Sequence, residues 1–584
     1  MRCKKFILFV FVGGMMGSSF VRAEEIEKPP LYLAILWHQH QPLYAKEPES
    51  GLYAKPWVRM HAVKDYYDMA SILEKYPQIH QTFNLTPSLI IQLEDIISGG
   101  QDKYFYLSQK KASELSREDR RFILLRFFDI YQKTLLEPYS RYKELLEKRG
   151  RVIEKGGRVI SSKTLEQKIG EFTTQDYLDL QVWFNLAWLD PDFKKEESIR
   201  FILDKSRNFT EEEKNIILKK HLEILKMIIP EHKKLQNKAQ IEITFTPFYH
   251  PILPLIYDTD LAKRSAPEIS LPLERFSYPE DAQAQVLKGI ELYKKYFGRE
   301  PLGMWPSESA VSQEVVDIIA GAGVKWIATD ECVLEKSLNI KIERDIGGNI
   351  LNPELLCQPY VCERRGKTLS VIFRERYILD LWGKHPRMKA EEAAQDIIDR
   401  LHNIYARLPK DKPYLVTLAS DGENAWEFFS DDGKEFLNAL YSELSGDPII
   451  KTITPSEYLK KHPPEKKIEN LWGGSWMGPN FNIWIGEGEE NLAWEYLGRT
   501  RKDLEVYKKG GEAEPDKLVR AFEEIYAAEG SDWFWWYGED MNSGDDEGFD
   551  LMFRNTLKNV YKIIGKKIPG FLEVPIVKSR EGQG

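Results

Sequence analysis

Two acidic residues lie where apolar, strand-like segments of the chain end. Glu308 follows the segment Leu302–Trp305, and Asp421 follows Tyr414–Ala419. A pair of carboxyl groups is what most enzymes use to cleave a glycosidic bond. In a parallel α/β barrel the carboxyl ends of the strands gather at one mouth, so residues far apart in sequence face one substrate. The sequence therefore predicts a carboxyl pair at such a mouth.

Other acids compete for these roles. Asp330 and Glu331 also follow a strand-like segment, and Glu423 lies two residues after Asp421. Structural interpretations exist as well, because acids favour the positive end of a helix, as near Glu308, and aspartate is typical of tight turns. The chemistry of these residue types alone does not decide which pair is catalytic.

Two histidines follow the first strand-like segment. His38 and His40 are two positions apart, so both side chains point to the same side of an extended strand. They would suit metal ligands, neutral donors to sugar hydroxyl groups, or structural residues. No second His-x-His pattern accompanies them in the sequence, which favours sugar contact over a metal site.

A run of aromatic residues provides a third signal. Trp533–Tyr537 is aromatic throughout, with Asp532 before it and acids after it. Indole rings stack on the apolar faces of sugars while carboxylates bind the hydroxyl groups. Burial in a core is the alternative, and for Phe534 and Trp535 it is the stronger one.

The elements that must position these residues alternate between strand-like and helical patterns. Seven nearly continuous apolar segments precede residue 421, namely Leu31–Trp37, Ile79–Leu85, Ile241–Thr246, Leu302–Trp305, Lys325–Thr329, Leu369–Arg374 and Tyr414–Ala419. Such segments are typical of strands buried on both faces. Helical patterns separate them, which predicts a parallel sheet with right-handed crossovers. Seven strands are one fewer than a complete eight-stranded barrel has.

The domain organisation follows from these patterns. Residues 1–23 have the basic start, apolar run and small-residue end of a signal peptide, which predicts a secreted or periplasmic protein. Residues 24–460 form the predicted barrel domain, with a charged helical insertion at about 94–235. Residues 461–575 are predicted to form a helical C-terminal domain that contributes to the substrate cleft.

Charge and cysteine content exclude several classes of partner. The formal net charge is −9, and the predicted signal peptide carries basic residues but no acidic ones. An acidic chain is not expected to bind nucleic acid or, after cleavage of the signal peptide, an anionic membrane. Of the cysteines that remain, Cys357 and Cys362 could form one disulfide, and no zinc-type pairs occur. No feature of the sequence specifies an oligomeric state.

Together these residues resemble glycoside hydrolase family 57, and in particular its amylopullulanase- and α-amylase-like members. The matching motifs occur in the family's order, at Trp37–Pro42, Thr82–Ser88, Thr246–Pro254, Gly303–Glu308, Ala328–Glu331, Asp421–Trp426 and Ser531–Tyr537. One departure follows the sixth strand, at Phe373–Gly383, and affects the expected rim of the substrate site.

The resemblance implies an incomplete seven-stranded (β/α) barrel followed by a helical bundle, and retaining chemistry on α-glucans, with α-1,4 and also α-1,6 links as candidate targets. It implies Glu308 as nucleophile and Asp421 as acid/base, with no metal and no cofactor. It places substrate-binding residues at His38, His40, His250, Trp305, Glu423, Trp426, Asp532, Trp533 and Trp536.

Rival hypotheses remain at this stage. A 4-α-glucanotransferase or a branching enzyme would use the same scaffold and the same carboxyl pair. A metal-dependent carbohydrate deacetylase or hydrolase would use His38 and His40 as ligands. A sugar-binding protein without catalytic activity is disfavoured, because the Glu308 and Asp421 pair is retained.

Overall fold

The computed structural model describes residues 28–577, apart from positions 48, 151–153, 156–157, 160–161 and 512. The predicted signal peptide lies outside the described residues and stays a prediction. None of the helices in the described part of the chain combines the length and the apolar composition that crossing a membrane requires.

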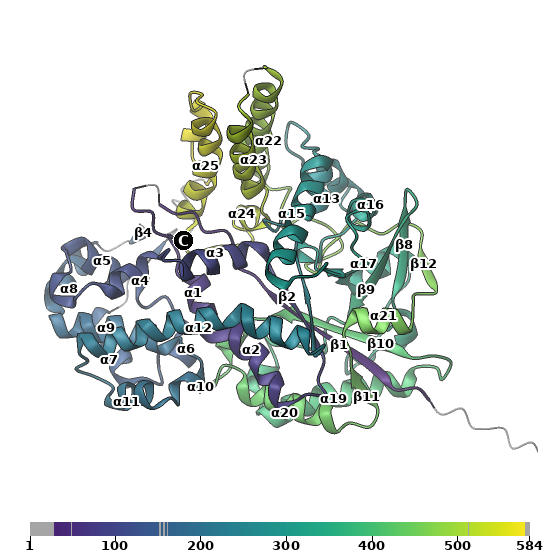
Figure 1. Ribbon diagram of the computed structural model, residues 1–584, viewed down its shortest axis with the longest axis horizontal. Coiled ribbons are helices and arrows are strands. Elements are labelled where there is room, and N and C mark those ends of the chain that lie inside the picture. The colour runs from purple at the N-terminus through teal and green to yellow at the C-terminus, as the bar shows by residue number, and fades with distance from the viewer. Residues whose placement is uncertain are drawn as a thin grey trace, which may run out of the picture.

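Seven parallel strands form the centre of the molecule (Figure 1). They are β1 (Leu31–Gln39), β2 (Gln81–Leu85), β5 (Ile241–Thr244), β6 (Gly303–Met304), β7 (Trp326–Asp330), β9 (Lys367–Arg374) and β10 (Tyr414–Asp421). Each contains residues of one predicted segment, which confirms the prediction of seven strands. The helices on the barrel side of the chain include α1 (Trp57–His61), α2 (Tyr67–Ser71), α15 (Pro279–Phe297), α16 (Val316–Gly321), α17 (Glu331–Leu338), α19 (Ala390–Arg407), α20 (Lys434–Gly446) and α21 (Pro455–Lys461).

The strands form an incomplete barrel. One sheet has the order β10-β1-β2-β5, with β11 (Ile450–Thr452) beside β1, and the other has the order β12-β8-β9-β7-β6. A parallel bridge between Phe245 and Met304 joins the two sheets. No ladder pairs β9 with β10 among the described strands, and one bond from Glu375 N to Thr417 O, 2.8 Å long, connects that side. The predicted fold class is confirmed.

A hairpin beside β9 was not predicted. Strand β8 (Tyr360–Arg364) runs antiparallel to β9, and β12 (Lys466–Ile468) lies along its other edge. Arg365 and Gly366 form the two-residue turn, and both have positive φ, 48° and 72°. This is the conformation of the tight turn that connects twisted antiparallel strands. Cys357, just before β8, and Cys362 within it are both buried and free, so they form no disulfide in this structure.

Alternation of side chains along the strands separates the barrel interior from the outer core. Ala34 and Leu36 of β1 belong to an inner apolar cluster that also contains Ala419 of β10. Side chains two residues apart lie on the same face of a strand, so His38 continues the inner face of β1 and Asp421 that of β10. The register pairs His38 with Asp421 directly. Both therefore lie at the mouth of the barrel.

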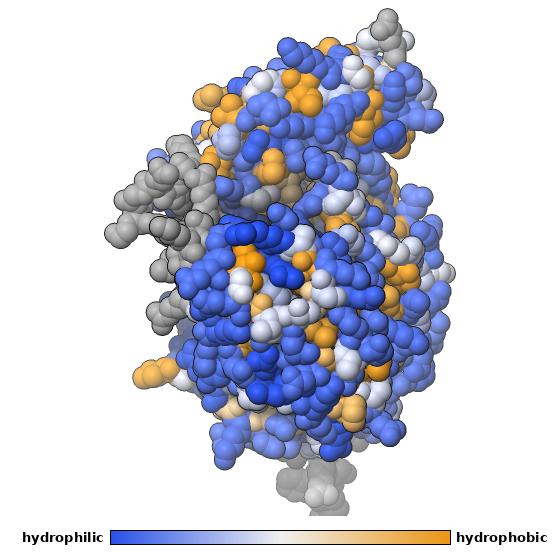
Figure 2. All heavy atoms as spheres, turned by 90° about the vertical axis from the view of Figure 1, so that its left-hand side faces the viewer, coloured by the Kyte–Doolittle hydropathy of each residue, from blue (hydrophilic) through white to orange (hydrophobic). Residues whose placement is uncertain are grey.

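The chain between β2 and β5 is helical and lies to one side of the barrel (Figure 1). Its principal helices are α3 (Pro87–Ile97), α4 (Lys103–Gln109), α5 (Arg117–Arg126), α7 (Ser140–Arg149), α8 (Ser162–Glu171), α9 (Thr174–Ala187), α10 (Pro191–Lys194), α11 (Glu197–Lys205) and α12 (Glu211–Asn237). The face they present is mostly hydrophilic, with scattered apolar residues (Figure 2). The exact boundaries of the insertion stay a prediction.

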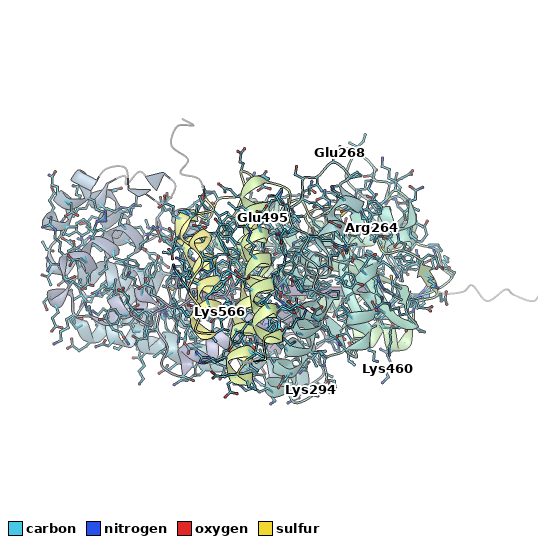
Figure 3. All side chains as sticks on the ribbon, turned by 90° about the horizontal axis from the view of Figure 1, so that it is seen from above. Arg264, Glu268, Lys294, Lys460, Glu495 and Lys566 are labelled. Carbon is cyan, nitrogen blue, oxygen red and sulfur yellow. The ribbon has the colours of Figure 1, made fainter. Side chains whose placement is uncertain are left out.

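Four helices follow the barrel and stand on one side of it (Figure 1), namely α22 (Gly488–Lys509), α23 (Pro515–Ala528), α24 (Ser531–Trp535) and α25 (Asp546–Ile563). Seen from above, they cross the front of the molecule, while charged side chains such as Glu268, Lys294 and Lys460 lie at its outline (Figure 3). A bond from Ser531 N to His250 O, 2.9 Å long, ties α24 to the segment after β5.

A buried lysine connects the barrel to the insertion. Lys434, at the start of α20, lies 2.5 Å from a carboxylate oxygen of Asp68, 2.9 Å from one of Asp190 and 2.6 Å from one of Asp192. Its side chain is only 8% exposed. Since these carboxylates lie within 4.8 Å of one another, the ammonium group balances charges that would otherwise repel each other in a poorly hydrated place.

We expect Lys434→Met to destabilise the protein by about 3–5 kcal/mol, because it leaves buried carboxylates without their counter-ion. The midpoint of urea unfolding measures the loss. Lys195→Met is the control, since Lys195 pairs with the same Asp192 at 2.8 Å but is 73% exposed. That change should alter stability by less than about 0.5 kcal/mol. Equal midpoints for the two variants would contradict the role given to Lys434.

Candidate active site

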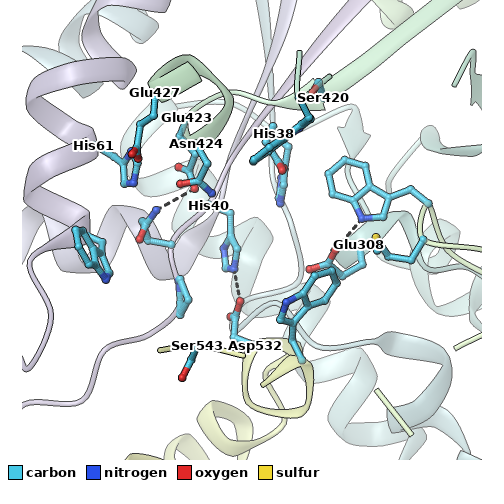
Figure 4. Close-up of a pocket in the computed structure, with 18 of the residues that line it drawn as sticks. His38, His40, His61, Glu308, Ser420, Glu423, Asn424, Glu427, Asp532 and Ser543 are labelled. Atoms are coloured by element: carbon cyan, nitrogen blue, oxygen red, sulfur yellow. Dashed lines mark hydrogen bonds and ion pairs between the residues drawn. The ribbon is translucent and has the colours of Figure 1, made fainter. Parts of the chain in front are cut away.

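A cleft of about 1020 Å³ opens at the carboxyl ends of the strands. Glu308 and Asp421 both line it. His38, His40 and Glu423 line it as well and are seen with Glu308 in Figure 4. Asp129 and Tyr131 of the insertion and Asp532 and Trp536 of the C-terminal helices complete the wall. The cleft thus draws residues from all three parts of the chain.

Glu308 lies four positions after Met304, the last residue of β6. Its backbone is in the left-handed region, with φ 55° and ψ 24°, and Ser309 follows with φ 52°. Such a conformation is strained for residues with a side chain, and strain of this kind concentrates at functional sites. Trp476 Nε1 donates a hydrogen bond of 2.7 Å to Glu308 Oε2, and His250 Nδ1 is 3.9 Å from Glu308 Oε1. The side chain is 13% exposed.

The two carboxyl groups have displaced pKa values. Burial, together with the charges of Asp532 and Asp421, raises the pKa of Glu308 to about 8, against the hydrogen bond from Trp476, which lowers it. Burial raises the pKa of Asp421 to about 6, and the neighbouring His40 and Arg374 oppose this rise. Between these values the pair holds one proton, and in the empty cleft that proton is mainly on Glu308.

The imidazole rings of His38, His40 and His250 lie close to one another beside the carboxyl pair. His38 Nδ1 is 2.7 Å from Asn84 Oδ1, and His40 lies between Thr86 Oγ1 at 3.2 Å and Asp532 Oδ1 at 2.8 Å (Figure 4). Burial and the neighbouring His40 lower the pKa of His38 to about 3, so His38 is neutral at physiological pH. A neutral imidazole of this kind presents a donor or an acceptor to a sugar hydroxyl group.

The same rings are poorly arranged for a metal ion. Ligand atoms of His40, His250 and Asp532 lie within 4.8 Å of one another. The rings of His40 and His250, however, are stacked at 3.8 Å with an interplanar angle of 15°. A metal ion binds to an imidazole nitrogen in the plane of the ring. Because these two rings are stacked in nearly parallel planes, one ion cannot lie in the plane of both at bonding distance. Both nitrogens of His40 also have protein partners already. The geometry favours hydrogen bonding over metal ligation.

The five candidate acids have different surroundings. Asp330 is fully buried and accepts a bond of 2.7 Å from Arg374 Nε, and Glu331 is paired with Arg344. Neither lines the cleft. Glu308 and Asp421 line the cleft, and among the described residues neither has a direct ion pair with an arginine or lysine. Glu423 shares both properties, but Tyr66 and Gln41 each donate to one of its two carboxylate oxygens.

Four residues predicted to bind substrate are buried and do not line the cleft in this structure, and their role in substrate binding stays a prediction. They are His250, Trp305, Trp426 and Trp533, each at least nine-tenths buried and none in the lining. Trp426 packs against Trp37 and donates to Met69 Sδ, and Trp533 donates 2.7 Å to Ala527 O. Apolar burial outweighs exposure for such large rings, so they support the wall. His250 and Trp305 support His38, at ring distances of 5.3 and 5.7 Å.

The structure also places residues in the cleft that were not predicted as site residues. Trp476 and Met477 come from the segment before α22, Trp57 and His61 from α1 of the barrel, and Trp188 from the helical insertion. The departing segment after β9 forms the rim through Arg376, Tyr377, Leu379, Asp380 and Trp382. The tryptophan between two glycines, at Gly474–Gly478, was a visible signal for the first group. The departure at Phe373–Gly383 was the signal for the rim residues.

Comparisons with known proteins show which family this chain is similar to. The sequence model of glycosyl hydrolase family 57 matches residues 34–469. An alpha-amylase of Pyrococcus abyssi is 22% identical over 250 residues, which cover 40% of this chain and 30% of that protein. A 4-alpha-glucanotransferase of Thermococcus litoralis is 21% identical over 247 residues, covering 40% and 29%. The matches thus span less than a third of these curated relatives.

Solved structures show the same fold over most of the chain. A family 57 branching enzyme from Thermococcus kodakaraensis has a TM-score of 0.57 at 15% identity, covering 91% of this chain and 90% of that one. The alpha-amylase AmyC from Thermotoga maritima has a TM-score of 0.52 at 14% identity, covering 93% and 96%. With the family match over most of the sequence, this chain belongs to glycosyl hydrolase family 57.

Proposed function

We propose that the protein is a retaining glycoside hydrolase that acts on α-glucans. Glu308 and Asp421, which follow different strands of the barrel, line the same cleft, and this supports the proposal most directly. Aromatic side chains on the same walls, among them Tyr377 and Trp382, are about half exposed and suit the apolar faces of glucose units. The names of the relatives, alpha-amylase, 4-alpha-glucanotransferase and branching enzyme, support an α-glucan substrate.

The proposed reaction has two steps. The Glu308 carboxylate attacks the anomeric carbon, the bond to the glycosidic oxygen breaks, and Asp421 gives its proton to that oxygen. The Asp421 carboxylate then removes a proton from water, whose oxygen attacks the anomeric carbon and releases Glu308. Positive charge that develops on the sugar favours the ionised form of Glu308, which moves the shared proton to Asp421 in the transition state.

We expect a bell-shaped dependence of kcat/KM on pH, with limbs near 6 and 8. Below about 6 both carboxyl groups are protonated and Glu308 cannot attack. Above about 8 both are ionised and no proton reaches the leaving oxygen. The singly protonated pair between these values is the active form, whichever carboxyl holds the proton in the empty cleft. Rates measured on a soluble maltooligosaccharide from pH 4 to 10 provide the check. A rate that keeps rising to pH 10 would contradict the pair.

Hydrolysis and transfer differ only in the second step, because a sugar hydroxyl group can replace water. Chromatography of products from maltoheptaose and from pullulan distinguishes α-1,4 from α-1,6 cleavage, and glucose release from chain-length redistribution. We propose hydrolysis as the main reaction, and transfer products longer than the substrate would assign a glucanotransferase instead. The same assay with EDTA tests the histidine-metal alternative, since activity should survive chelation.

We also propose that residues 1–23 direct export and that the mature enzyme is secreted or periplasmic. The basic start and the apolar run support this. N-terminal sequencing of the protein from its native source, with an expected start near Glu24, tests it.

A further inference from the structure

Trp476 contacts the proposed nucleophile twice. Its indole Nε1 donates 2.7 Å to Glu308 Oε2, and its backbone N donates 3.1 Å to Glu308 O. The two residues are 168 positions apart in sequence. One residue thus fixes both the carboxylate and the left-handed backbone of Glu308, and it leaves Oε1 as the oxygen without the indole partner. The indole ring also packs edge-on against Trp305 and His38 (5.4 and 5.8 Å).

Trp476 is itself held from behind. Its backbone carbonyl accepts 2.7 Å from Arg376 Nη2, and the Arg374 guanidinium lies over its ring at 5.0 Å. Arg374 in turn is paired with the buried Asp330. Two backbone bonds between Gly474 and Val311, 2.9 and 3.1 Å long, anchor the segment beside the nucleophile loop. The ring therefore has little freedom to move away from Glu308.

We propose that Trp476 is a positioning residue that aims the Glu308 carboxylate and favours its ionised form. This rests on the proposed function. A hydrogen bond from a neutral donor to a carboxylate is stronger than one to a protonated carboxyl group, so it stabilises the state that attacks. With Oε2 held by the indole, Oε1 faces the sugar. Arg374 and Arg376 act through Trp476 and hold it in place.

Trp476→Phe tests the proposal, because it keeps an aromatic ring and removes the N–H donor. We expect the maximum of kcat/KM to fall about tenfold to a hundredfold and the falling limb of the pH profile to move up by about one unit. Loss of the donor raises the pKa of Glu308, so the limb moves to higher pH. The form with Glu308 ionised and Asp421 protonated, which is the one that reacts, then becomes rarer.

Trp472→Phe is the matched control. Trp472 lies in the same segment, donates 2.9 Å to Pro479 O and does not line the cleft. Its profile should match the wild type.

The outcomes separate the two proposals. If the wild type cleaves glucans and Trp476→Phe keeps both its rate and its pH limbs, the positioning role is wrong. If the wild type cleaves none, the proposed function fails and this inference fails with it. Should Trp476→Phe not fold, Arg376→Met removes the 2.7 Å bond behind the indole, and a smaller shift of the same limb in the same direction supports the role. An unchanged profile for that variant would overturn it.

Discussion

Glu308→Gln is expected to abolish cleavage while sugar binding persists. The amide has the shape of the carboxyl group and still accepts a hydrogen bond from Trp476, but it cannot attack the anomeric carbon. Removal of a catalytic nucleophile lowers kcat by roughly 10³-fold or more, and often by much more. Turnover of maltooligosaccharides measures the rate, and calorimetric titration measures binding. The pKa of Glu308 is raised to about 8 in the wild type, and the glutamine that replaces it does not ionise. Sugar binding by Glu308→Gln should therefore not change with pH around 8.

Glu331→Gln is the matched control for that variant. Glu331 is also buried, and its pKa is raised to about 7 by burial and by Glu375, against the pairing with Arg344. It lies outside the cleft, so its loss affects stability without touching the reaction. Near-normal kcat for a folded Glu331→Gln and none for Glu308→Gln would separate chemistry from folding. Normal turnover by Glu308→Gln would end the assignment of the nucleophile.

Asp421→Asn is expected to slow natural glucans by about 10²- to 10⁴-fold, since an acid/base catalyst typically contributes that much. The first step on a substrate with a good leaving group, such as a nitrophenyl glycoside, should be nearly unaffected, because that oxygen needs no proton. On such a substrate the rate of the first step should rise with pH and not fall again. The midpoint should lie below 8, since loss of the Asp421 charge lowers the pKa of Glu308.

A small anion provides the second half of this experiment. Azide attacks a glycosyl-enzyme without the help of a base, so it should restore turnover of Asp421→Asn on the activated substrate. The product should be the α-glycosyl azide, because two displacements retain configuration. A β product would indicate a single displacement and contradict the covalent intermediate. Equal losses on natural and activated substrates would count against the acid/base role of Asp421.

The sequence determined the strands and the residues at their ends. Near-continuous apolar segments such as Tyr414–Ala419 have few alternatives to a buried strand, so all seven were visible. The period of two along a strand then placed the side chains of His38 and His40 on the same side. Both signals depend only on residues close together in sequence, so they can be read from one sequence alone. The hairpin strand β8 was missed because its charged residues Glu363 and Arg364 interrupt the apolar pattern.

Only the tertiary structure decided which of these residues meet. Asp330 and Glu331 stand at a strand end as Glu308 does, yet Arg374, 44 positions along the chain, pairs with Asp330, and Arg344, 13 positions along, pairs with Glu331. The bond from His40 to Asp532 spans 492 positions, and that from Trp476 to Glu308 spans 168. No periodicity encodes such contacts, because they depend on how helices and loops pack after the strands have formed. The same packing buries Trp426 and Trp533, since a large ring gains more from the core than from the cleft.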